Sequence, residues 1–227
     1  MMNKRVINIA IDGPSGAGKS TIARFLAKEL GFIYVDTGAL YRTVGYAVLK
    51  NGIDTKDAAA VEALLPSITV TMGYVDGEQH VFLNGEDVSG YIRTPEVSMA
   101  ASVTSAMPPV RQFLFRLQQE TARTNSVIMD GRDIGTVVLP NADVKIFLTA
   151  STEDRAQRRF AELKEKGMDV TYEDVLKDMK ERDYNDSHRA AAPLKPADDA
   201  RQIDTSGNTL EESIALLKQV VLETVKE

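Results

Sequence analysis

The residues with the clearest chemistry are those from Gly13 to Ser20, which read GPSGAGKS. They match G-x-x-x-x-G-K-[ST], the phosphate-binding loop called the P-loop. Glycines allow backbone angles that side chains forbid, so successive amide groups can turn toward one anion. Lys19 can reach the outer phosphates of a nucleoside triphosphate, and the Ser20 hydroxyl can ligate Mg²⁺. The motif therefore predicts a triphosphate site with a metal ligand.

A strand before this loop and a helix after it must position the motif. Residues 6–11 form an apolar run of buried-strand length. Residues 21–30 carry apolar side chains at helical spacing, and Gly31 follows as a stop signal. The helix N-terminus adds the positive end of its dipole beside the bound anion.

The rest of the chain alternates short apolar strands with helices. Further strands are predicted at residues 32–35, 127–130, 144–148 and 202–204, and helices at 39–50, about 56–65, from 95, 108–125, 151–166, 171–189 and 209–225. Ser151 to Asp154 reads as a capping box. This order predicts an α/β protein of the P-loop NTPase fold, with a five-stranded parallel sheet and helices on both faces.

Residues 67–90 break the alternation. They contain two β-rich runs around Asp76-Gly77, a hairpin turn signal. We predict a small antiparallel β insert with a peripheral role in shaping its region. Elsewhere, the polar motifs at 12–20, 36–37, 130–133 and 151 follow strand ends, where ligands bind in parallel sheets.

Composition narrows the class of protein. The chain has 227 residues, a net charge of −6 and no cysteine. An acidic balance argues against a general nucleic-acid or membrane-surface binder, and the missing cysteines fit a reducing compartment. The N-terminal apolar run is too short for a signal sequence or a membrane span. We expect a cytoplasmic monomer that handles small nucleotides and binds neither nucleic acid nor membrane.

Arginines gather in two places. Two predicted helices after the fourth strand hold Arg155, Arg158, Arg159, Arg182 and Arg189. A second group, Arg42, Arg111 and Arg132, falls near the other cluster of motifs, earlier in the chain. A charged helix is usually a solvated face. Beside a P-loop, however, two sets of arginines suit two phosphorylated substrates, whose mutual repulsion must be neutralised.

Three functions remain open at this point. The guanine-reading Asn-Lys-x-Asp is missing, which disfavours a GTPase switch. A kinase with a phosphate acceptor needs no base, since that acceptor is already ionised at pH 7, and neither His80 nor His188 is well placed as one. Asp36 could serve as a base for an alcohol acceptor in another small-molecule kinase. A nucleotide-dependent binding protein without transfer is the third reading.

Several segments together are more specific than the P-loop. They are residues 11–20, 36–42, 85–89, 92–94, 130–136, 181–183 and 189–193. On these motifs the chain resembles bacterial cytidylate kinase over essentially its full length, and the insert at 67–90 is a further mark of that family. The resemblance implies transfer of the ATP γ-phosphate to CMP or dCMP, giving CDP or dCDP and ADP, with Mg²⁺.

The resemblance also implies one kinase domain in three parts. The core would comprise residues 1–36, 126–150 and 190–227. An acceptor region, residues 37–125, would bind the monophosphate and carry the insert, and a mobile lid would span about residues 151–189. These two names are kept below.

Site residues follow from the motif and the resemblance. The expected catalytic residues are Lys19, Arg132, Arg155 and Arg159. The expected ATP-binding residues are Asp12, Gly13, Pro14, Ser15, Gly16, Ala17, Gly18, Lys19, Ser20, Thr21 and Arg158. The expected CMP-binding residues are Thr37, Tyr41, Arg42, Ser102, Arg111, Arg132, Asp133, Arg182, Asp186 and Arg189. Ser20 is the expected metal ligand, although some relatives have glycine there, and Thr37 replaces a serine common in the family.

Cytosine recognition can be assigned from hydrogen-bonding groups. The base presents a donor at N4 and acceptors at N3 and O2. We expect Asp133 and Ser102 to face N4 and Arg111 to face N3 and O2.

Overall fold

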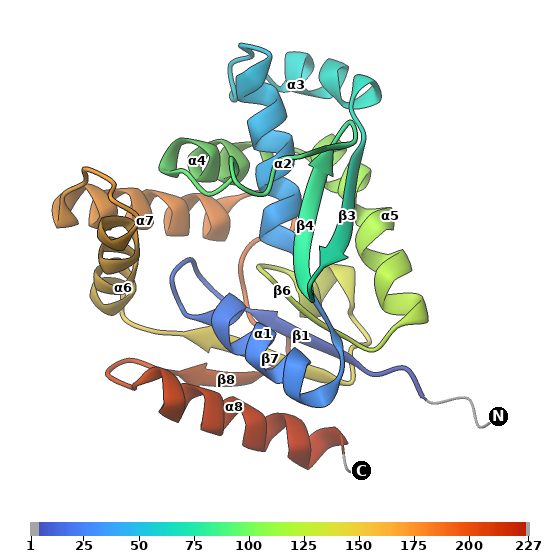
Figure 1. Ribbon diagram of the computed structural model, residues 1–227, viewed down its shortest axis with the longest axis vertical. Coiled ribbons are helices and arrows are strands. Elements are labelled where there is room, and N and C mark those ends of the chain that lie inside the picture. Colours follow the sequence, from blue (N-terminus) through green and yellow to red (C-terminus); the bar gives the residue numbers. More distant parts are fainter. Residues whose placement is uncertain (1–4, 226–227) are drawn as a thin grey trace.

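The predicted parallel sheet is present in the computed structural model, which describes residues 5–225 (Figure 1). Its strands are β1 (Asn8–Asp12), β2 (Ile33–Asp36), β6 (Val127–Gly131), β7 (Val144–Thr149) and β8 (Arg201–Asp204). They are arranged in the order β2-β6-β1-β7-β8, and all four pairings are parallel. β1, which leads into the P-loop, is therefore the central strand.

Helices cover both faces of the sheet because successive strand residues point to opposite sides. Ile9 and Ile11 of β1 pack with Ile22 of α1 (Lys19–Leu30) and Val221 of α8 (Leu210–Val225) on one face. Ala10 packs on the other face, in a cluster that includes residues of α5 (Pro108–Thr124) and η2 (Ile134–Val138). Burial on both faces explains the nearly continuous apolar runs of the strands.

The acceptor region has a core of its own. It contains α2 (Thr37–Lys50), α3 (Ala58–Leu64), η1 (Leu65–Ser67), β3 (Val70–Val75), β4 (Glu78–Leu83), β5 (Glu86–Asp87) and α4 (Pro95–Thr104). The antiparallel sheet β3-β4-β5 confirms the predicted β insert and adds a short third strand. α2 and α4 cross at Gly45, where an added Cβ would lie 2.8 Å from the Ala101 nitrogen. Glycine thus allows the close crossing that aligns the two helices.

The lid is a packed helix pair, α6 (Thr152–Glu165) and α7 (Tyr172–His188), at the left of Figure 1. As predicted, Ser151 and Thr171 cap these helices by accepting hydrogen bonds from the amides of Asp154 and Asp174. The predicted capping box at Ser151 is only half formed. The Asp154 side chain accepts from the Gly207 amide at 3.2 Å, which ties α6 to the loop before α8.

A π-helical turn was also not predicted. Residues Ile134–Val138 form a π-helical turn after β6. The Asp12 carboxylate accepts hydrogen bonds from the Ile134 and Gly135 amides, at 2.8 and 2.7 Å, and so fixes the start of this turn. Within residues 5–225, no helix has the length and apolar character needed to cross a membrane.

Candidate functional site

The P-loop joins β1 to α1 in the conformation that the motif predicts. Gly13, Gly16 and Gly18 have φ values of 148°, 75° and 87°. An added Cβ at Gly13 would lie 1.9 Å from the Leu148 carbonyl oxygen, so this position excludes side chains. Gly18 precedes α1 and offers no capping side chain, which leaves the first amides of the helix for an anion.

Lys19 is held inside this loop. Its Nζ donates to the Pro14 carbonyl oxygen at 2.7 Å, and only 5% of the residue is exposed. Burial, together with the nearby Arg132 guanidinium, lowers the pKa of Lys19 to about 7. A phosphate group beside Lys19 would favour the protonated amine and act as its ion-pair partner.

Ser20 lies against a buried carboxylate. Its hydroxyl donates to Asp130 at 2.8 Å, and the Tyr34 hydroxyl donates to the other oxygen of Asp130 at 2.9 Å. Because Ser20 gives its proton to Asp130, its lone pairs stay available to a cation. In the described part of the chain, no group of three or more His, Cys, Asp or Glu forms a metal cage.

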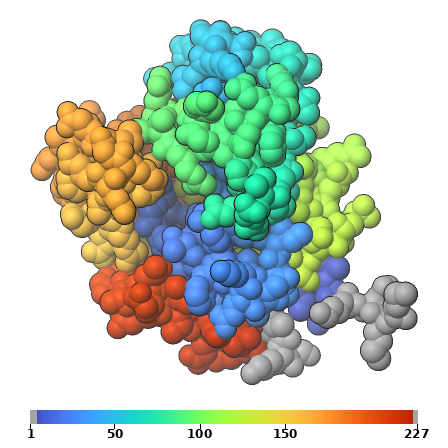
Figure 2. All heavy atoms as spheres, viewed as in Figure 1, coloured from blue at the N-terminus to red at the C-terminus, as the bar shows by residue number. Residues whose placement is uncertain are grey.

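A cavity of about 140 Å³ opens beside the P-loop. Figure 2 shows the surface hollowed between the orange lid and the green part of the acceptor region. The predicted site residues that line it are Ser15, Gly16, Lys19, Ser20, Thr37, Tyr41, Arg42, Ser102, Arg132, Asp133, Arg182, Asp186 and Arg189. The fold therefore brings four of the predicted ATP-binding residues and nine of the ten predicted CMP-binding residues to one cavity.

Buried carboxylates hold most of the arginines at this cavity. Arg132 donates to Asp186 at 2.7 Å, and Arg42 donates to Asp36 at 2.9 Å. Asp133 accepts from both Arg111 and Arg189. Such pairs fix the orientation of each planar guanidinium.

Arg182, unlike these arginines, forms no ion pair within residues 5–225. Its Nε is buried and has no hydrogen-bond partner among residues 5–225, and the same is true of Arg42 Nε. Burial and the neighbouring Arg132 lower the pKa of Arg182 to about 10. Crowded, incompletely paired guanidiniums form a site that a phosphate group would stabilise.

The lid arginines share α6 but contact three different places. Arg155 donates to the Ser15 carbonyl oxygen at 3.0 Å and to Asp183 at 2.7 Å. Arg158 donates to the Thr205 carbonyl oxygen at 3.0 Å, and Arg159 donates to Glu162 and to the Arg93 carbonyl oxygen. Arg155 thus contacts the P-loop, whereas Arg158 contacts the loop before α8.

Several predicted residues do not line the cavity. They are Asp12, Gly13, Pro14, Ala17, Gly18, Thr21, Arg111 and the three lid arginines. Asp12 is occupied by the η2 amides, and Thr21 is exposed on α1. Arg111 donates to Asp133, and its guanidinium lies 5.7 Å from the centre of the Tyr41 ring. Their ligand contacts stay predictions.

Other residues line the cavity although they were not among the expected site residues. They are Gly38, Ser98, Ala101, Ser105, Asp130 and Gly131, together with Asp36, which was considered only as a base for an alcohol acceptor. Ser98, Ser102 and Ser105 lie three or four positions apart on the mostly apolar α4 and the residue that follows it. That spacing is a polar stripe on one helix face and could have been found in the sequence.

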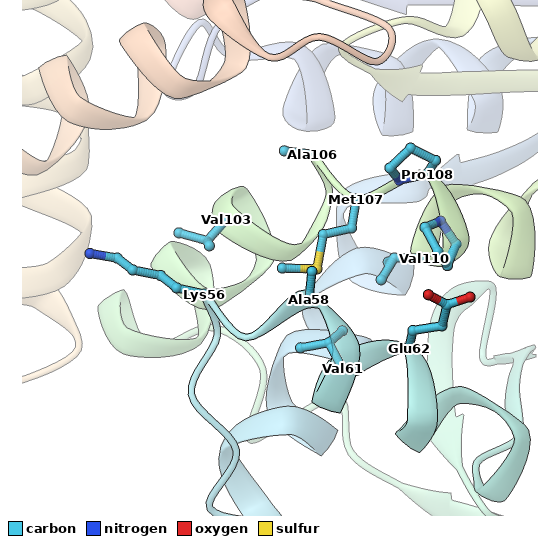
Figure 3. Close-up of a pocket in the computed structure, with 10 residues that line it drawn as sticks. Lys56, Ala58, Val61, Glu62, Val103, Ala106, Met107, Pro108 and Val110 are labelled. Carbon is cyan, nitrogen blue, oxygen red and sulfur yellow. The ribbon is translucent and has the colours of Figure 1, made fainter.

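A second cavity, of about 390 Å³, lies behind the α4–α5 turn. Figure 3 shows it lined mainly by apolar side chains such as Val61, Met107 and Val110, with Lys56 and Glu62 as its charged residues. It has no convergent cations, so it does not suit phosphates.

Both the sequence and the fold have relatives among known proteins. Residues 9–223 match the family model described as Cytidylate kinase. Proteins named Cytidylate kinase from Caldicellulosiruptor bescii and Ligilactobacillus salivarius are 54% and 49% identical to the chain. The first alignment covers 97% of both chains, and the second covers 96% of this chain and 97% of the relative. An uncharacterized protein from Eubacterium ventriosum has a similar structure, with a TM-score of 0.51 at 12% identity over 94% of this chain and 96% of that one.

Proposed function

The chain belongs to the cytidylate kinase family, and we propose that it transfers the γ-phosphate of ATP to CMP or dCMP through the residues of the 140 Å³ cavity. The observation that carries the proposal is that one cavity joins the P-loop lysine to four partly or fully buried arginines, which are Arg42, Arg132, Arg182 and Arg189. The products are ADP and CDP or dCDP.

The donor triphosphate lies along the P-loop in this proposal. The free amides at the start of α1 and the Lys19 ammonium bind its outer phosphates. Arg155 donates to the Ser15 carbonyl oxygen and thereby fixes the lid to the loop that cradles the phosphates. In such sites catalysis comes from positioning and charge stabilisation rather than from covalent chemistry with the protein.

The acceptor phosphate lies among Arg42, Arg132 and Arg182. Two unit charges of the same sign at ~4 Å repel by about 4 kcal/mol at an effective dielectric near 20, so approach of two phosphates requires these cations. The unpartnered Nε groups of Arg42 and Arg182 support this assignment. Arg132 is held by Asp186 in an orientation that the ligand does not have to impose.

A phosphate acceptor also fits the state of Asp36. Its carboxylate accepts from the Ala39 amide, Arg42 and Arg93. Burial by itself would raise the pKa of Asp36, but the Arg42 and Arg93 guanidiniums bring it below the ordinary value. Such a carboxylate is a poor base, which disfavours an alcohol acceptor.

Cytosine lies deeper in the cavity, near Asp133 and Ser102. Asp133 accepts from Arg111 and Arg189, and each carboxylate oxygen keeps a lone pair for the N4 amino group. Arg111 also donates to the Ser105 carbonyl oxygen at 3.4 Å, which supports a fixed place for the guanidinium that we assign to N3 and O2.

Ser20 and Asp130 would hold Mg²⁺ with the triphosphate. The hydrogen bond from Ser20 to Asp130 supports this fit, because the hydroxyl oxygen then presents only lone pairs to the cation. A metal ion held there would offset part of the negative charge of the triphosphate. Sequence reasoning gave Asp130 no role of its own.

A coupled assay of ADP formation tests the proposal. We expect turnover with CMP and dCMP, weak turnover with UMP, and none with shikimate or gluconate. Turnover with an alcohol but not with CMP would favour the small-molecule kinase. ATP-dependent partner binding without any acceptor turnover would favour a binding protein.

A further inference from the structure

The strand that leads into the acceptor region lies at an open edge of the sheet. Among the strands of residues 5–225, β2 pairs only with β6. The Ile33 amide donates to the Ser126 carbonyl oxygen toward β6. Because the backbone groups of successive strand residues point to opposite edges, those of Tyr34 and Asp36 face outward. Buried backbone groups of this kind need partners.

Side chains of the β3–β4 hairpin supply these partners. The Tyr74 hydroxyl donates to the Tyr34 carbonyl oxygen at 2.9 Å. Gln79 Oε1 accepts from the Asp36 amide at 2.7 Å, and Gln79 Nε2 donates to the Asp36 carbonyl oxygen at 3.2 Å. Tyr74 and Gln79 are paired across the hairpin. The Gln79 carboxamide therefore contacts Asp36 as a neighbouring strand would.

Asp36, whose backbone is held by Gln79, lines the cavity and lies at the start of α2. The Asp36 side chain caps α2 through the Ala39 amide and binds Arg42. The next residue, Thr37, donates to the Asp130 carbonyl oxygen at 2.8 Å and lines the cavity. A shift of the Asp36 peptide would therefore displace both the start of α2 and the Arg42 guanidinium.

The same carboxylate connects to the lid. Arg93 donates to Asp36 at 3.2 Å, and its carbonyl oxygen accepts from Arg159. The insert, the start of the acceptor region and the lid thus meet at Asp36. Gln79 is the residue of the insert that binds both backbone groups of Asp36.

We propose that Gln79 is a positioning residue for the acceptor site, which acts by fixing the Asp36 peptide and, through Asp36, Arg42 and the start of α2. The inference rests on the proposed function, since Arg42 is assigned there to the acceptor phosphate. The contact between Gln79 and the Asp36 backbone would link the β insert, which we expected to be peripheral, to the acceptor site. Within the described residues, neither Gln79 nor Asp36 forms a hydrogen bond to the P-loop, so we expect the effect to fall mainly on the acceptor.

Steady-state kinetics of Gln79→Ala test the proposal. We expect KM for CMP to rise about 5–30-fold, the range set by losing the equivalent of one or two hydrogen bonds. KM for ATP should stay within about twofold. Gln79→Glu keeps the acceptor for the Asp36 amide but turns a second oxygen toward the Asp36 carbonyl, so it should lose at least as much. Hydrogen exchange of the Asp36 amide should be faster in Gln79→Ala, which removes the acceptor of that amide.

His80→Ala is the matched control. His80 is the next residue of β4, and its ring nitrogen lies 2.6 Å from Asp87 on the exposed side of the insert. This variant should leave CMP kinetics within about twofold, although it removes an interaction of the same hairpin. The contrast separates the Gln79 contact from a general loosening of the insert.

The outcomes are distinct. An unchanged KM for CMP in Gln79→Ala, or an equal rise in both KM values, would overturn the inference. If Gln79→Ala does not fold, Tyr74→Phe removes only a hydroxyl and should give a smaller rise in KM for CMP alone, whereas an unchanged KM would again overturn it. Failure of the proposed function has a different signature, because the unmodified protein would then form no ADP with CMP.

Discussion

Binding of ATP should be coupled to proton uptake by Lys19. In the free protein, burial and Arg132 lower the pKa of this lysine to about 7, so it is about half protonated at pH 7. Triphosphate oxygens favour the charged amine and raise its pKa again. Since binding favours the protonated form, affinity is retained below pH 7 and declines as the pH rises above it.

The size of the effect follows from the free-state pKa. With a pKa of about 7 in the free protein and an amine that stays protonated in the complex, the apparent Kd for ATP with Mg²⁺ should rise about fivefold from pH 7 to pH 8. Uptake should be about half a proton per ATP at pH 7 and about 0.9 at pH 8. Asp12, whose pKa burial raises to about 6, is already largely ionised at pH 8 and contributes little there.

Calorimetric titration without CMP measures both quantities. The binding enthalpy at pH 8, taken in buffers with different ionisation enthalpies, gives the number of protons taken up. Lys19→Arg is the control, because a guanidinium stays protonated and should abolish the uptake and flatten the pH dependence. Uptake near zero in the unmodified protein, or an unchanged pH dependence in Lys19→Arg, would refute the assignment of the proton to Lys19.

Three further predictions concern the same cavity. Lys19→Ala should lower turnover by ~10²–10³-fold while leaving the Tm nearly unchanged, and a near-normal rate would exclude the P-loop from the mechanism. ATP with CMP, or a bisubstrate analogue, should protect residues 155–190 from hydrogen exchange, whereas equal protection without ligand would make the lid a fixed helix pair. Asp133→Asn should lower kcat/KM for CMP more than for UMP, and a CMP/UMP ratio that changes by less than about threefold would leave Asp133 only the role of holding arginines.

Sequence reasoning predicts those parts of the fold that depend on neighbouring residues. The P-loop, the five strands, the hairpin at Asp76-Gly77 and the caps Ser151 and Thr171 are all coded within a few positions, and the structure contains each of them. The order of the strands in the sheet cannot be predicted from neighbouring residues, because it depends on which apolar faces pack together.

Patterns among neighbouring residues do not predict which site residues pair with one another. Arg132 and Asp186 are 54 positions apart, and Ser102 and Asp186 are 84 positions apart. The sequence places arginines near the site but cannot separate Arg132, held by a carboxylate, from Arg182, whose Nε has no partner in the described residues. The π-helical turn after β6 was missed for the same reason, since its amides bind Asp12 from a distant strand.

These pairings explain how a chain of net charge −6 can bind two phosphorylated substrates. Asp36, Asp133 and Asp186 are buried, and each orients at least one arginine that lines or adjoins the cavity. Removing one partner of a buried ion pair is destabilising by roughly 3–5 kcal/mol, because the other charge stays buried. Variants of Arg132 or Asp186 should therefore lose stability together with activity. Lys19 and Arg182 have no carboxylate partner among the ion pairs of the described residues, so substitutions there report more directly on ligand charge. The acidic residues of this site thus act as the framework of the anion site, and its unpaired cations supply the charge.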